Sequence, residues 1–144
     1  MANFVYNVAL GRIAEKIANG ATLKMLVLKT AGSDATLKDL NTVAAVLAEG
    51  STSEADFTNY TRKTLASLTD TVDDSGDVVK NDCADVVFTA AGGASNNTTT
   101  DVIIYEEVTN DADSIPLVQL DAVFTTDGND VTLVINANGF HNAS

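Results

Sequence analysis

Residues 22–30 read Thr-Leu-Lys-Met-Leu-Val-Leu-Lys-Thr, a nearly continuous apolar run. A strand that faces solvent on one side alternates apolar and polar residues, whereas a strand covered on both faces is apolar along most of its length. The run therefore predicts a strand buried on both faces.

Helical patterns flank this strand on both sides. Apolar residues recur at a four-residue spacing over residues 5–17, which predicts a helix, and Asn19-Gly20 is a typical helix end. After the strand, Thr36-Leu37-Lys38-Asp39 has the form of a capping box, because Thr and Asp side chains can each accept from a free backbone amide. It predicts a second helix that runs through residues 40–47 and ends at Gly50.

The rest of the chain has the pattern of a β protein. Short runs rich in Val and Thr are separated by turns of Gly, Asn and Asp, and the Ser-Gly and Asp-Gly pairs in these turns are hairpin signals. We expect strands near residues 61–72, 78–80, 84–90, 101–108, 117–124 and 130–136. The predicted fold class is α+β: N-terminal helices and a strand, followed by an antiparallel β-sandwich or small barrel. We expect an N-terminal portion over 1–60 and an acidic β domain over 61–144, or one continuous domain over 1–144.

Charge is divided unevenly along the 144 residues. The net charge is −12, and residues 64–144 hold Lys80 as their single basic residue against fourteen Asp and Glu. A pI near 4.1 argues against a nucleic-acid partner, because such binding begins with neutralisation of phosphates. Two interpretations remain open: an acidic face that keeps the protein soluble, or a near-neutral portion that docks on a partner while the acidic portion faces solvent or a basic surface.

Few residues are available for chemistry. One Cys and one His exclude an intramolecular disulfide and a Cys/His zinc cluster. Asp82 and Asp85 flank Cys83 and should raise the pKa of its thiol, and His141 lies near a chain end, so we expect both to be structural or inert. We expect no enzyme activity and no cofactor. The start lacks a signal-peptide pattern and no apolar run is long enough to cross a membrane, which together with the lone Cys predicts synthesis in a reducing cytoplasm and no membrane partner.

Two acidic turns leave calcium open as an alternative. Residues 73–77 and 127–130 carry several Asp side chains, and hard oxygen ligands of this kind suit Ca²⁺. Neither turn matches the twelve-residue EF-hand loop with its terminal Glu, and Asp, Asn and Gly favour turns for local reasons. A small calcium- or carbohydrate-binding β module therefore stays as an alternative.

The most distinctive segment is Tyr60-Thr61-Arg62-Lys63, at the junction of the two portions. It places an aromatic ring beside two cations, and Tyr and Arg are enriched at the anchor points of interfaces. The alternative is a first strand whose Tyr packs inside and whose cations balance acidic neighbours.

This segment resembles small structural proteins of tailed-phage virions, which often carry a Tyr-x-Arg-Lys-x-Leu stretch after a helix and an apolar strand. The matching residues are Tyr60, Arg62, Lys63 and Leu65, and the late turn with its alternating strand over 127–133 and Gly139-Phe140 continue the likeness. The resemblance spans residues 13–144. It implies a virion component, most commonly a capsid decoration (cement) protein that acts as a trimer on the outer capsid surface after synthesis in the bacterial host cytoplasm.

The resemblance makes the major capsid protein and further copies of the chain the expected partners. In a decoration protein the contacts would span the seams between capsid subunits. A position at the neck, tail or fibre base is the alternative. The candidate partner-binding residues combine the N-terminal segment with the distinctive one: Phe4, Val5, Val8, Arg12, Tyr60, Arg62 and Lys63.

Overall fold

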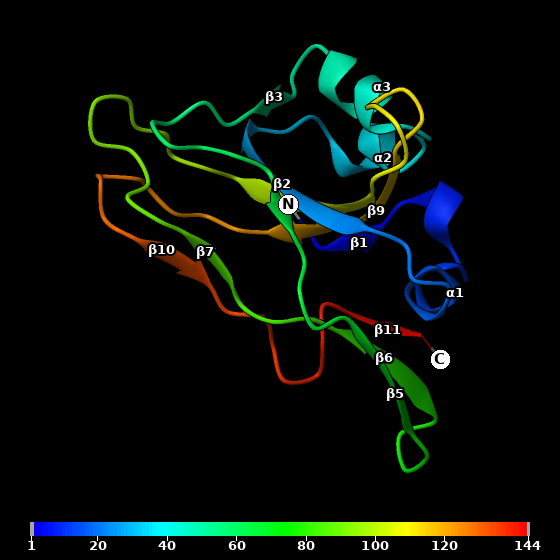
Figure 1. The fold of residues 1–144 in the computed structure, drawn as a ribbon. Helices are drawn as coiled ribbons and strands as arrows, with labels where there is room; N and C mark the ends of the chain where they lie inside the picture. Colours follow the sequence, from blue (N-terminus) through cyan, green and yellow to red (C-terminus); the bar gives the residue numbers. More distant parts are fainter. Residues whose placement is uncertain (1, 144) are drawn as a thin grey trace.

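The computed structural model describes residues 2–143 as a stack of three layers (Figure 1). A twisted antiparallel sheet forms the middle layer, with strand order β1-β9-β8-β2-β3 and with β4 also paired to β2. Two short helices lie over one face of this sheet, and two small sheets, β10-β7 and β11-β6-β5, lie below the other. The α+β class with sandwich-like packing is thereby confirmed.

All the regular elements are short. The helical ones are η1 (Asn7–Ala9), α1 (Ile13–Ala18), α2 (Asp34–Leu37) and α3 (Val43–Ala48). The strands are β1 (Phe4–Val5), β2 (Leu23–Thr30), β3 (Ser53–Glu54), β4 (Lys63–Thr64), β5 (Thr69–Asp73), β6 (Val78–Asp82), β7 (Val86–Phe88), β8 (Asp101–Glu106), β9 (Ile115–Asp121), β10 (Val131–Leu133) and β11 (His141–Ala143).

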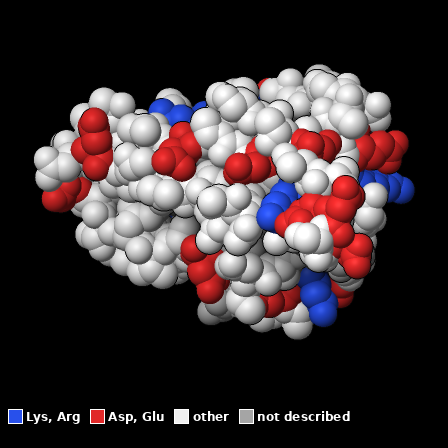
Figure 2. Space-filling view, turned by 90° about the horizontal axis from the view of Figure 1, so that it is seen from below, with Lys and Arg blue, Asp and Glu red and all other residues white. Residues whose placement is uncertain are grey.

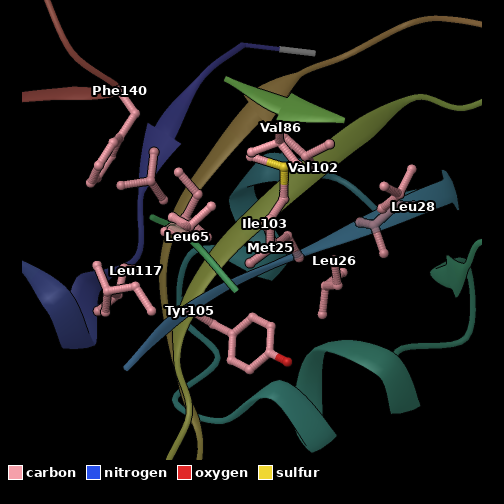
Figure 3. Packing of buried hydrophobic residues seen from close by; sticks show 14 of the residues in the cluster. Met25, Leu26, Leu28, Leu65, Val86, Val102, Ile103, Tyr105, Leu117 and Phe140 are labelled. Atoms are coloured by element: carbon pink, nitrogen blue, oxygen red, sulfur yellow. The ribbon is translucent and has the colours of Figure 1, made fainter. Parts of the chain in front are cut away.

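The register of the central sheet separates two apolar faces. Met25 in β2 pairs with Ile104 in β8, and Ile104 pairs with Val118 in β9, so these side chains share one face. Leu26 and the residues paired with it lie on the opposite face. Figure 3 shows Val86 and Val102 together on the side of the small sheets, while the Tyr105 ring points toward the short helices. The strand over 22–30 is therefore covered on both faces, as its sequence predicts.

The helix predicted over residues 5–17 is wrong in its first half. Phe4 and Val5 pair with β9 as a strand, η1 follows, and only residues from Ile13 onward form α1. Gly11 has φ +73°, a left-handed conformation that interrupts a right-handed helix. The four-residue spacing of apolar residues does not distinguish a single helix from this arrangement. Ala9 in η1 and Ile13 in α1 belong to separate elements, yet both side chains are buried in the core.

The capping box predicted at 36–39 is also wrong. Ser33 caps α2 by accepting a hydrogen bond from the Thr36 amide at 3.3 Å. Thr42 in turn caps α3 through the Ala45 amide at 3.1 Å. One predicted helix is thus two shorter ones, because each has its own hydroxyl cap and a turn between them.

The later strands lie close to their predicted positions, with three differences. The single strand predicted over 61–72 is wrong: it divides into β4, which pairs with β2, and β5, which pairs with β6 in another sheet. The Ser75-Gly76 turn joins β5 and β6 in a hairpin, as expected, but the turn at residues 127–130 joins β9 to β10, which lie in different sheets. β11 has no counterpart among the predicted strands, since its His-Asn-Ala sequence carries no strand signal.

The central sheet takes strands from both portions of the chain. β1, β2 and β3 come from residues 1–60, and β4, β8 and β9 come from residues 61–144. Within residues 2–143 no helix has the length and apolar character that crossing a membrane requires.

Candidate functional site

The Tyr60–Lys63 segment forms the edge of a charged group that we call the Arg62 cluster: Glu54, Tyr60, Arg62, Tyr105 and Asp111. The Arg62 guanidinium donates through Nε and Nη2 to the two Glu54 carboxylate oxygens, each at 2.7 Å. It donates through Nη1 and Nη2 to the Asp111 carboxylate at 2.6 and 2.9 Å. Two bidentate pairs of this kind are among the strongest ion pairs that proteins form.

Aromatic side chains complete the Arg62 cluster. The guanidinium carbon lies 5.6 Å from the centre of the Tyr105 ring, within the range of a cation–π contact. The Tyr60 hydroxyl donates to Glu54 Oε1 at 2.7 Å and accepts from the Val27 amide at 3.0 Å. The Tyr60 ring stacks on Phe88 at 6.2 Å between centroids. The cluster therefore ties β3 and the chain before β4 to β2 and β8.

The electrostatics of the cluster favour its charged state. The hydrogen bonds that Arg62 donates to Glu54 and Asp111 raise its pKa above the usual value. The hydrogen bond from Arg62 lowers the pKa of Asp111, and burial raises the pKa of Tyr60. Arg62 is consequently always a cation here, with its donors directed at groups of the same chain.

This geometry matches the alternative interpretation of the segment. Tyr60 packs inside and Arg62 balances two carboxylates, while the Lys63 ammonium lies 5.2 Å from the centre of the Phe88 ring. Both Arg62 and Lys63 are half-buried. Contact of these residues with a partner stays a prediction.

The N-terminal candidates lie elsewhere. Phe4 and Val5 belong to β1, and the Phe4 ring packs at 5.1 Å on the buried ring of Tyr6. Val8 is half-buried in η1, and Arg12 is exposed at the start of α1. Since β9, β8 and β2 separate β1 from β4 in the sheet, the structure does not bring the two sets of candidates together.

Two exposed apolar side chains were missed by the sequence analysis. Leu10, between η1 and α1, is 61% exposed beside Arg12, and Val72 in β5 is 68% exposed. Leu10 lies within residues 5–17, the range of the predicted helix, where it flanks the apolar positions. The left-handed conformation of Gly11 and the break in that helix are what leave it outside the core.

The hairpin that carries Val72 is the second candidate surface. We call it the arm: β5, the turn at residues 74–77, and β6. The arm projects below the central sheet (Figure 1), and α1 lies against its strands. A hollow of about 440 Å³ lies on it, lined by Val72, Asp73, Val78, Val79, Ala143 and the turn residues Asp74 and Asp77.

Cys83 and His141 sit in protected environments. Cys83 is buried, and burial together with Asp82 and Asp85 raises the pKa of its thiol to about 11. His141 belongs to β11, where its Nδ1 lies 2.6 Å from Asn81 Oδ1, and burial lowers its pKa. A thiol with so high a pKa is a poor nucleophile at neutral pH.

The acidic turns are held by their own hydrogen bonds. Asp73 Oδ1 accepts from the amides of Ser75 and Gly76, each at 3.1 Å, and Asp127 Oδ1 accepts from the Asn129 amide at 3.0 Å. Among the residues that the structure describes, no three or more His, Cys, Asp or Glu side chains converge in a way that could hold a metal ion. Local turn geometry thus accounts for these side chains.

A longer groove runs between the end of β9 and residues 132–142. Two adjoining hollows of about 450 and 300 Å³ share Leu120, Asp121, Val134 and Ile135 as walls. Val134 on its rim is 75% exposed.

No family of known proteins, no curated protein and no solved structure matches this chain.

Proposed function

We propose that this chain is a structural protein of a tailed-phage virion that binds the outer capsid surface as a decoration protein. The observation that carries the proposal is a pair of outward surfaces, each with an exposed apolar side chain and exposed charged residues close to it in the chain. Leu10 and the exposed Arg12 are two residues apart in the chain, and Val72 lines the hollow on the arm together with Asp74 and Asp77. The resemblance around Tyr60 supports the same class of protein.

Two such surfaces suit a protein that joins neighbouring subunits. An interface needs an apolar centre that loses water and a charged rim that selects the partner. A protein that binds only the assembled capsid stabilises that state by mass action. Capsid symmetry presents the same seam many times, and a closed trimer is the arrangement we expect at three-fold positions.

The N-terminal surface is the first to test on particles. Tyr6 and Ile13 are 0% and 1% exposed, so deletion of the N-terminal segment would remove part of the core as well as the surface. The double variant Leu10→Ser with Arg12→Ser changes only exposed side chains. It should bind virions stripped of the native protein about tenfold more weakly, by loss of one apolar contact and one charge.

A matched control is Val108→Ser, because Val108 is a 53% exposed valine outside residues 7–18 and outside the arm. We expect it to bind stripped particles as the wild type does. Equal binding by the double variant and the wild type would contradict the proposed surface.

The number of copies per particle tests the position in the virion. A decoration protein is present at about one copy per capsid subunit, in the hundreds, whereas a neck or tail ring holds about a dozen. Quantification of the chain in purified virions by gel densitometry separates the two. A copy number of about a dozen per virion would favour the neck, tail or fibre base. Absence of the chain from purified virions would overturn the proposed function.

A further inference from the structure

The outer edge of the arm is open. Within residues 2–143 β5 pairs with β6 alone, and four of its five residues are exposed. An open strand edge presents unpaired backbone N–H and C=O groups that an extended peptide can join as an additional strand. Backbone hydrogen bonds along this edge would therefore contribute to affinity, but they would not select the amino-acid sequence of the partner.

An apolar row crosses the sheet next to this edge. Val72 in β5 pairs with Val79 in β6, and Val79 pairs with Ala143 in β11, so the three side chains share one face. Val72 is largely exposed while Val79 and Ala143 are half-buried. The row forms the floor of the 440 Å³ hollow on the arm.

Carboxylates of the turn surround this floor. Asp73 is paired with Lys80 at 2.8 Å and accepts hydrogen bonds from its own turn. Asp74 and Asp77 are exposed, and their side chains make no hydrogen bond or ion pair with other residues that the structure describes. Figure 2 looks onto this side of the molecule, where acidic side chains far outnumber basic ones.

An apolar floor with a carboxylate rim fits one kind of side chain. Lysine and arginine place an aliphatic stem on apolar surface and keep the charged group at the rim. A second copy of this chain does not fit, because pairing of β5 with another β5 would bring Asp70 and Asp73 toward like charges. The charge of the arm therefore selects a basic partner.

We propose that the arm binds an extended, lysine- or arginine-bearing segment of a partner protein, which pairs along β5 and inserts one basic side chain into the hollow beside Val72. This inference rests on the proposed function for the identity of the partner, a basic segment of the capsid surface. The chemistry of the arm itself is independent of that identity.

The test uses the full chain, labelled with ¹⁵N, and a synthetic nonapeptide that alternates lysine and threonine. Titration should shift the amide signals of residues 70–80 and 143, with saturation. The same peptide with glutamate in place of lysine should cause no saturable shift. A pattern spread over the whole acidic surface, or one centred on the groove between β9 and residues 132–142, would overturn the proposal.

Two variants test which residues of the arm contribute to the affinity for the peptide. Asp74→Asn with Asp77→Asn should weaken peptide binding about fivefold, which is the scale of two exposed ion pairs. Val72→Thr keeps the β-branched shape and should weaken it about twofold by loss of apolar contact. The matched control is Asp113→Asn with Asp121→Asn, which removes two exposed carboxylates outside the arm and α1 and should leave the affinity within twofold. Equal weakening by the control pair would overturn the proposal.

Sedimentation with virions separates this inference from the proposed function. If the peptide binds the arm but the wild-type chain does not bind virions, the function is wrong and the arm chemistry stands. If the chain binds virions but the arm neither shifts with the peptide nor responds to Asp74→Asn with Asp77→Asn, the arm inference is wrong and the function stands.

Discussion

The Arg62 cluster and the arm are two acidic regions of one chain that differ in how their charges are used. In the cluster, Glu54 and Asp111 both face the guanidinium of Arg62 in bidentate geometry. On the arm, Lys80 forms an ion pair with Asp73, while Asp74 and Asp77 face solvent. The paired charges of the cluster hold elements of the sheet together, whereas our proposal assigns the unpaired charges of the arm to the binding of a partner. The expectations below test this difference, beginning with the largest effect.

Arg62→Ala should lower the free energy of unfolding by about 3 kcal/mol, because it leaves two partly buried carboxylates without their counter-charge. Urea unfolding followed by circular dichroism measures the change. Arg12→Ala is the control, since Arg12 is an exposed arginine and should lie within about 0.5 kcal/mol of the wild type. Equal stability of Arg62→Ala and Arg12→Ala would show that the cluster does not hold the sheet together.

Gly139→Ala should cost about 2 kcal/mol, and the loss should concentrate on the sheet that carries the arm. Gly139 has φ +84°, and an added Cβ would collide with the Asn81 carbonyl oxygen in β6. Gly11→Ala is the matched control: Gly11 has φ +73° with no atom close to the position of a Cβ, so only the cost of the left-handed backbone, about 1 kcal/mol, remains. A Gly139→Ala protein no less stable than Gly11→Ala would argue that β11 does not pack on β6.

Asp101→Asn should change the pH dependence of stability in the central sheet, by less than the two changes above. Asp101 is fully buried, its Oδ1 accepts from Gln119 Nε2 at 3.2 Å, and burial raises its pKa. A raised pKa means that the ionised form is disfavoured in the folded state, so this group costs stability at neutral pH and the cost fades as the pH falls through its folded pKa.

The measurement is the difference in free energy of unfolding between Asp101→Asn and the wild type from pH 7 to pH 4. We expect the variant to be more stable at pH 7 and the difference to shrink toward acid pH. A difference that grows toward acid pH would mean that Asp101 is stabilising as an anion.

Asp74→Asn with Asp77→Asn should have the smallest effect on stability, within about 0.5 kcal/mol, because both side chains are exposed and outside the hydrogen bonds of the turn. Thermal melting followed by circular dichroism is sufficient to check this. A loss comparable to that of Arg62→Ala would place these carboxylates in the structure of the arm and remove the contrast between the two regions.

Much of the fold was predictable from the sequence because it depends on local patterns. The apolar runs at 22–30, 101–106 and 117–121 fill strands that are buried on both faces. The helix over 5–17 failed for a physical reason: four-residue spacing also describes a strand, a turn and a short helix that each place one apolar side chain in the core. The left-handed Gly11 decides between them, and its φ is not visible in a pattern.

The candidate site was harder to predict because its contacts are distant in sequence. Glu54 and Asp111 lie 8 and 49 residues from Arg62, and only the pairing of β2 with β8 and β4 brings them together. The aromatic and basic residues around Tyr60 mark a distinctive segment of the sequence, but they do not reveal which residues of the same chain form ion pairs with Arg62. The arm was predicted as a hairpin through Ser75-Gly76, whereas its open edge depends on which strand lies last in the sheet.

Hydrogen–deuterium exchange of the free chain and of the chain on intact virions tests the central claim, that unpaired arm charges and the open β5 edge serve binding. The account predicts that peptides covering residues 69–77 exchange quickly in the free chain and become protected on particles, while β2 and β8 are protected in both states. Unchanged exchange of residues 69–77 on virions that carry the chain would contradict it.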